Sequence, residues 1–152
     1  MPPTIEQEIT TALAQGAVFY FVERTLTTNS PHYFVLLNKA PVPQDDLVFV
    51  FAVSDVAGRS DRRLKLDLTT DRATLVVATS ADYTELSRES LFDCSSHVRK
   101  TLADLVLLGR ERRLQIKTPI PQPLLNKLVA GAMVSKLMPD ELKKKITPPP
   151  TP

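Results

Sequence analysis

Three short apolar runs follow one another between residues 17 and 53 of this 152-residue chain. They cover residues 17–22, 32–37 and 47–53, are rich in aromatic and β-branched side chains, and lack the 3.6-residue repeat of an amphipathic helix. Polar loops separate them, and the second loop contains Pro41 and Pro43. Because such side chains suit a pleated surface and proline cannot donate a hydrogen bond to a sheet, we expect three strands joined by turns.

Further strands are expected downstream, where the chain again forms short apolar runs or alternates apolar and polar residues. The predicted strands lie at residues 64–68, 74–78, 90–94 and 110–117, and Ser80 is expected to cap a helical turn that reaches Leu86. We expect the run 47–53 to be central and 64–68 to be an edge strand. Many short strands at close spacing predict a mainly β, α+β protein with a small barrel or a strongly curved antiparallel sheet over about residues 16–117.

Helical patterns flank these strands. Over residues 3–14, isoleucine and leucine recur every four residues, and Thr4 and Gln7 have the spacing of a capping box. Further helices are expected from Thr101 to Leu108, where Gly109 ends the helix, and over about 122–137. A last helical turn is expected at 139–146. Residues 147–152 are mostly proline and predict a disordered or polyproline tail, so residues 1–146 form one expected domain.

The composition narrows the classes of function. No apolar stretch is long enough to cross a bilayer, and the N-terminal residues have neither part of a signal peptide, so we expect a cytoplasmic protein that does not bind a membrane. One cysteine and two histidines exclude a disulfide framework and offer no metal-ligand spacing, so no metal or other cofactor is expected. The net charge of +2 is divided unevenly, because residues 1–58 are acidic and the rest is basic, which permits a polyanionic partner.

Gly16-Ala-Val opens the first expected strand, and residues 31–37 cover the second. This order of segments resembles the PemK/MazF-like toxin family, which has Gly-Asp-Val at the first of these places and an Arg-Pro-aliphatic strand at the second. Residues 49–54 end in a serine, where the family strand ends in threonine or serine, and residues 74–78 and 90–99 resemble its later strand and the segment that follows it. The similarity in pattern extends from Gly16 to about residue 137.

This resemblance implies an SH3-like barrel that cleaves single-stranded RNA without a metal, forms a homodimer and binds an acidic antitoxin protein. Two family residues are replaced. Ala17 stands in place of the acidic residue after the first glycine, and His32 stands at or near the place of the arginine in the second strand. The hydroxyl position is retained as Ser54.

Metal-free RNA cleavage needs a proton acceptor, a proton donor and hydrogen-bond donors for the phosphate oxygens. Histidine titrates near neutral pH and serves as acid or base, so His32 and Ser54 are the candidate catalytic residues. The candidate RNA-binding residues are Arg59, Arg62, Arg63, His97 and Arg99.

Plainer interpretations of the same residues stay open. His32 is also typical of a hydrogen-bonded residue at the start of a strand. Ser54 is typical of a hydroxyl in a turn, and His97 is typical of an exposed loop residue. The arginines at 59–63 alternate with Asp55 and Asp61, as in a solvated loop with internal salt bridges. The alternative function is therefore a non-catalytic protein-interaction module on the same barrel, such as a mobile-element accessory protein or an antitoxin-like binder.

Overall fold

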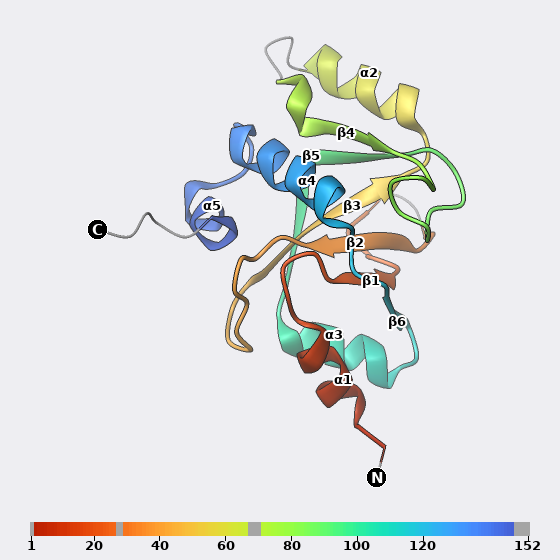
Figure 1. Cartoon of the computed structure of the whole chain (residues 1–152), viewed down its shortest axis with the longest axis vertical. Coiled ribbons are helices and arrows are strands. Elements are labelled where there is room, and N and C mark those ends of the chain that lie inside the picture. Colours follow the sequence, from red (N-terminus) through yellow and green to blue (C-terminus); the bar gives the residue numbers. More distant parts are fainter. Residues whose placement is uncertain (1, 27–28, 67–70, 148–152) are drawn as a thin grey trace.

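The structure, a computed structural model, describes residues 2–26, 29–66 and 71–147. Its centre is a six-stranded antiparallel sheet with strand order β4-β5-β3-β2-β1-β6 (Figure 1). The strands are β1 (Val18–Phe21), β2 (His32–Leu36), β3 (Leu47–Val53), β4 (Leu75–Ala78), β5 (Ser90–Lys100) and β6 (Leu114–Lys117).

The sheet is curved and does not close, with β4 and β6 at its two edges (Figure 1). This confirms the expected α+β class and the curved antiparallel sheet, while the closed barrel is not what forms. Strand β3 lies between β2 and β5, as its apolar sequence predicts, and the strand expected at 74–78 forms as the edge strand β4 over Leu75–Ala78. Closure is unnecessary because helices cover both faces of the sheet.

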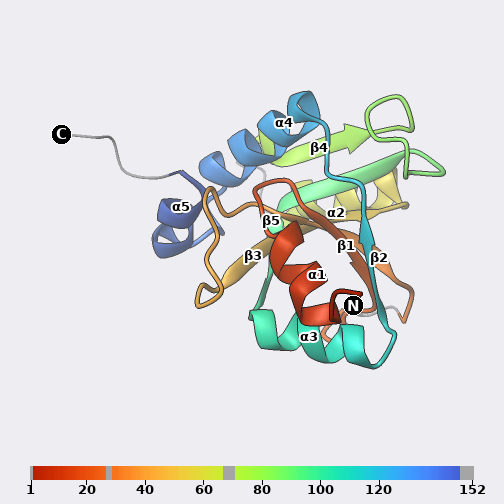
Figure 2. The same cartoon turned by 60° about the horizontal axis from the view of Figure 1, so that its bottom comes forward.

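The two faces of the sheet have different side chains. Alternate residues direct Phe19, Phe34 and Phe49 to one face, which we call the aromatic face; it is covered by α1 (Ile5–Ala12) and α3 (Leu102–Arg110). The neighbouring residues direct Val18, Val35 and Val50 to the other, aliphatic face, which is covered by α4 (Gln122–Val134) and α5 (Asp140–Ile146). Figure 2 shows α4 and α5 on one side of the sheet and α1 and α3 on the other.

The N-terminal capping box is confirmed, since Thr4 Oγ1 accepts the Gln7 amide and Gln7 Oε1 accepts the Thr4 amide. The prediction that Gly109 ends its helix is wrong, because α3 continues to Arg110. A Cβ at Gly109 would collide with Ile5 of α1, so this glycine permits close packing of two helices. The chain turns instead at Arg112, whose φ of 59° is left-handed.

The polar stretch after β3 is a helix, α2 (Val56–Leu66), and the predicted edge strand at 64–68 is wrong as far as the described residues extend. Asp55 starts the helix: its side chain accepts the Gly58 amide at 3.2 Å and its carbonyl accepts the Arg59 amide at 3.0 Å. Leu64 and Leu66 thus belong to a helix, and residues 67 and 68 lie outside the described residues. Helix α2 lies at the β4–β5 end of the sheet (Figure 1).

Of four smaller expectations, two change, one is confirmed, and one falls almost entirely outside the described residues. The turn after β4 is organised by Thr79 and Asp82, whose side chains bind backbone amides, rather than by a Ser80 cap. The helix expected over 122–137 ends at Val134, while the last helical turn is confirmed as α5. Of the predicted tail, residues 148–152 lie outside the described residues.

Strand β5 is the longest in the sheet and continues through residues 95–99, beyond the strand expected at 90–94. Its pairing with β3 changes register: Val50 is opposite His97, whereas Ala52 is opposite Phe92. Several residues of β5 thus lie opposite the single residue Phe51 of β3, and they form a large bulge in β5. Such bulges redirect side chains that a regular strand would place on alternate faces.

No helix in the described parts of the chain is both long enough and apolar enough to cross a membrane.

Candidate functional site

A pocket of about 410 Å³ lies on the aromatic face, at the start of β2 and the end of β3, beside α2. Four residues predicted from the sequence, on three different segments, line it. Its lining residues are Thr25, Leu26, Ser30, His32, Phe51, Val53, Ser54, Asp55, Arg59 and Arg62. The floor is apolar, whereas the hydroxyls, the histidine and the charged groups provide polar walls.

His32 is the first residue of β2 and lies opposite Phe21 of β1. Its ring is close to Phe51, with 5.7 Å between the ring centroids, and its Nδ1 lies 3.1 Å from the Ala52 carbonyl oxygen. Burial lowers the pKa of His32 below its usual 6.5, more strongly than the Ala52 hydrogen bond raises it. A neutral imidazole that donates Nδ1–H to this carbonyl has its lone pair on Nε2.

Ser54 and Asp55 follow β3 directly and lead into α2, so the end of a buried strand places both on the pocket wall. Arg62 NH2 lies 3.7 Å from Asp55 Oδ2, and the two side chains are 64% and 66% exposed. Exposed pairs of this kind contribute little to stability, so Arg62 can exchange Asp55 for an incoming anion at low cost. This pair matches the interpretation of the arginine segment as a solvated surface with internal salt bridges.

Arg59 and Arg63 lie one helical turn apart on α2 and bind the same two residues of the β5 bulge. Asp93 Oδ2 accepts Arg63 Nε at 2.9 Å and Arg59 Nε at 3.4 Å. Ser96 Oγ accepts NH2 of Arg59 at 2.8 Å and NH2 of Arg63 at 2.9 Å. We call these four residues the arginine clamp. Asp93 is only 3% exposed, so the clamp surrounds a buried carboxylate.

His97 and Arg99 do not join the pocket. They lie opposite Val50 and Val48 of β3, on the aliphatic face and not on the face that carries His32. Burial, and then the charge of Arg99, lower the pKa of His97. Arg99 NH2 binds Glu141 of α5 at 3.2 Å. Its closest partner therefore lies on a helix that covers the aliphatic face, on the side of the sheet away from the pocket.

Sequence reasoning missed Asp93 and Ser96, although the chain contained two signals. Asp93 is a lone carboxylate between Phe92 and Cys94 in an apolar run, and a buried charge requires a partner. Arg59 and Arg63 have the four-residue spacing that places two side chains on one helix face. Cys94, next to Asp93, is also buried, and burial raises the pKa of its thiol to about 12.

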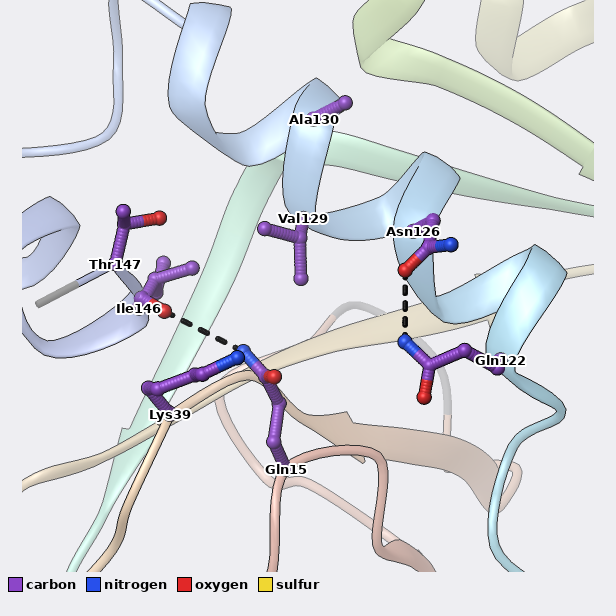
Figure 3. Close-up of a pocket in the computed structure, with 8 residues that line it drawn as sticks. All are labelled: Gln15, Lys39, Gln122, Asn126, Val129, Ala130, Ile146 and Thr147. Atoms are coloured by element: carbon purple, nitrogen blue, oxygen red, sulfur yellow. Dashed lines mark hydrogen bonds between the residues drawn. The ribbon is translucent and has the colours of Figure 1, made fainter.

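A second pocket, of about 260 Å³, lies between α4, the end of α5 and the segment after β2 (Figure 3). Gln15 Nε2 donates to the carbonyls of Leu37 at 2.9 Å and Ile146 at 3.3 Å, and so links three distant segments. Gln122 Nε2 donates to Asn126 Oδ1 at 2.7 Å. Side-chain amides, Lys39 and Thr147 are the polar residues on its wall, so among the described residues that line it there is no histidine or carboxylate to move a proton.

In the described ranges, no three histidine, cysteine or carboxylate side chains gather in a group that could hold a metal ion. A scan against models of known protein families found no match, and a search of curated proteins found none either.

Proposed function

We propose that this protein is a metal-independent endoribonuclease that cleaves single-stranded RNA, as a toxin of the PemK/MazF-like kind. One observation carries the proposal: His32, Ser54, Arg59 and Arg62, selected from the sequence for this chemistry, line the same pocket. A neutral histidine, a hydroxyl and guanidinium groups are the side chains that transesterification of RNA requires.

His32 acts as the general base in this proposal. With Nδ1–H donated to the Ala52 carbonyl, Nε2 takes the proton of the ribose 2′-hydroxyl. The lowered pKa keeps the imidazole neutral at neutral pH, which is the protonation state that a base needs. The carbonyl also orients the ring, because rotation would break the hydrogen bond.

The other polar groups act on the phosphate. The 2′-oxygen attacks phosphorus, the bond from phosphorus to the 5′-oxygen breaks, and the 5′-oxygen leaves with a proton from water. The products are a 2′,3′-cyclic phosphate and a 5′-hydroxyl. Ser54 and the exposed guanidinium of Arg62 donate hydrogen bonds to the phosphate oxygens, whose negative charge grows in the transition state.

The expected partners follow from the resemblance and belong to the same proposal. They are a second copy of the chain, in a homodimer, and an acidic antitoxin protein, all in the cytoplasm. The excess of basic residues after position 58 supports a polyanionic RNA or an acidic protein as a ligand.

A non-catalytic interaction module remains the second candidate, and one observation favours it. Two of the four arginine and lysine residues of α2, Arg59 and Arg63, already bind an internal carboxylate, which reduces their availability to RNA. On this interpretation the clamp fixes α2, and α2 presents a protein-binding surface.

Induced expression in growing bacteria separates the two candidates. The chain, His32→Ala, Ser54→Ala and the control Lys127→Ala, on the exposed side of α4, are compared for growth and for the integrity of total RNA. The nuclease proposal expects growth arrest with RNA fragmentation from the chain and the control, and relief by both pocket substitutions. Normal growth with intact RNA, from folded protein, supports the interaction module.

A further inference from the structure

The arginine clamp contains one more positive charge than it contains negative charges. Asp93 supplies one carboxylate to two guanidinium groups, and Ser96, the other acceptor, is neutral. Asp93 Oδ1 is also occupied, because it accepts the Ser95 amide at 3.0 Å. One guanidinium charge is therefore not neutralised in a partly buried setting, where an additional anion is bound more strongly than in water.

The two arginines of the clamp are not equivalent. Arg63 makes the shorter bond to Asp93 and is 15% exposed, whereas Arg59 makes the longer bond and is 30% exposed. Arg59 also lines the pocket with Arg62, three residues further along α2. Arg63 thus completes the buried side of the clamp, while Arg59 is the more exposed of the two and is the clamp arginine that lines the pocket.

The β5 bulge makes this arrangement possible. The change in register between Val50 and Ala52 lets Asp93 and Ser96, three residues apart, approach the same pair of arginines. In a regular strand, residues three apart point to opposite faces of the sheet.

We propose that Asp93 and Ser96 are positioning residues that, with Arg63, hold the Arg59 guanidinium at the pocket wall, where it binds a phosphate group of a single-stranded nucleic acid. This inference rests on the proposed function for the identity of the ligand, and it names the residues that fix the phosphate contact. Arg59 is the group that touches the ligand; the other three act through it.

The sign of one substitution makes the inference testable. Asp93→Asn removes a negative charge, so general electrostatics predicts tighter binding of a polyanion. Positioning predicts the opposite, because an amide has one acceptor oxygen where the carboxylate has two, and Arg59 therefore loses the charged acceptor that holds it. We expect affinity to fall about tenfold, the size of one lost charge-assisted hydrogen bond. Ser96→Ala leaves the net charge unchanged and is expected to weaken binding in the same direction.

The probe is a short, mixed-sequence 2′-O-methyl oligoribonucleotide, which cannot be cleaved because its 2′-oxygen is blocked. Its dissociation constant is measured against salt concentration for the chain, Arg59→Gln, Asp93→Asn and Ser96→Ala. The control is Arg110→Gln, which removes an exposed charge from α3. Thermal melts show whether each variant is folded. If Asp93→Asn does not fold, the dissociation constant of Ser96→Ala alone tests the positioning role.

The salt slope identifies a lost phosphate contact. Each contact to a single strand contributes about 0.7 to the slope of log affinity against log salt, so Arg59→Gln and Asp93→Asn should each lower it by about 0.7 and Arg110→Gln should not. Unchanged or tighter binding by both Asp93→Asn and Ser96→Ala overturns the positioning role, as does a chain that does not bind the probe.

Cleavage of unmodified RNA by the same proteins separates this inference from the proposed function. Binding that depends on Arg59 and Asp93, in a chain that does not cleave RNA, supports the clamp and refutes the nuclease. If the chain cleaves RNA but the clamp substitutions leave its affinity for the probe unchanged, the nuclease proposal is supported and the positioning role of the clamp is refuted.

Discussion

His32 shows how its surroundings determine what a residue can do. Its strand places it on the aromatic face against Phe51, and the Ala52 carbonyl binds Nδ1. Burial lowers its pKa, so the ring is neutral under conditions where an exposed histidine is partly protonated. His97 is also half-buried with a lowered pKa, but it lies on the opposite face and faces no predicted catalytic partner.

At this scale we predict the pH dependence of RNA cleavage. A base must be deprotonated, so the rate should rise with pH through an apparent pKa below 6.5 and become level near neutral pH. His32→Gln should lower the rate by about 100-fold or more and remove this step. Initial rates on one RNA across the range test it. A rate that falls as pH rises through the same range would show that His32 is not the base.

At the scale of elements, strands with continuous apolar runs were predictable from sequence and α2 was not. The runs at 17–22, 32–37 and 47–53 became β1, β2 and β3 because each has apolar residues for both faces of a buried sheet. Helix α2 has too few apolar residues to mark a buried face, and its leucines mimic a strand. It is attached to β5 through Asp93 and Ser96, and such long-range partners cannot be read from local sequence.

The same reasoning explains which parts of the pocket could be predicted. His32, Ser54 and the arginines were identifiable as residue types at strand ends, where side chains converge. Asp93 and Ser96 were not identified because the bulge that joins them depends on how β5 pairs with β3. His97 and Arg99 were grouped with the pocket for their chemistry, whereas β5 continues through residues 95–99 and strand geometry directs both to the other face.

We predict that the arginine clamp holds α2 on the sheet. Arg63→Met keeps most of the side-chain volume but leaves Asp93 Oδ2 with only its longer arginine partner, and should lower the free energy of unfolding by about 1–3 kcal/mol. Hydrogen exchange of α2 amides should quicken. Arg62→Met, on the same helix but in an exposed pair, should change stability by less than about 0.5 kcal/mol. Equal effects of the two substitutions would mean that the clamp does not anchor the helix.

At the scale of the whole molecule, one sheet separates two sets of interactions. The aromatic face carries α1, α3 and the pocket, while the aliphatic face carries α4 and α5, with Arg99 bound to Glu141. Both faces contain a histidine whose pKa burial lowers. Acidification should therefore affect the whole fold and not the pocket alone.

The unfolded chain binds protons at these histidines with a pKa near 6.5, whereas the folded chain binds them only at lower pH. Stability should thus be complete above pH 6.5 and decrease as pH falls below it, even above about pH 5, where most carboxylates remain ionised. Urea unfolding across this window tests the prediction. The His32→Gln/His97→Gln double variant should show a flatter dependence, and an identical slope would exclude the histidines as the cause.

The proposal of a metal-independent ribonuclease is best tested by incubating a defined single-stranded RNA with purified protein in the presence of EDTA. The chemical groups at the new RNA ends are then analysed. If His32 is the base of such a nuclease, the chain and Lys127→Ala produce fragments with 2′,3′-cyclic phosphate and 5′-hydroxyl ends, and His32→Gln produces none. Intact RNA from folded protein would contradict the account, as would cleavage by the His32→Gln variant at the rate of the unaltered chain.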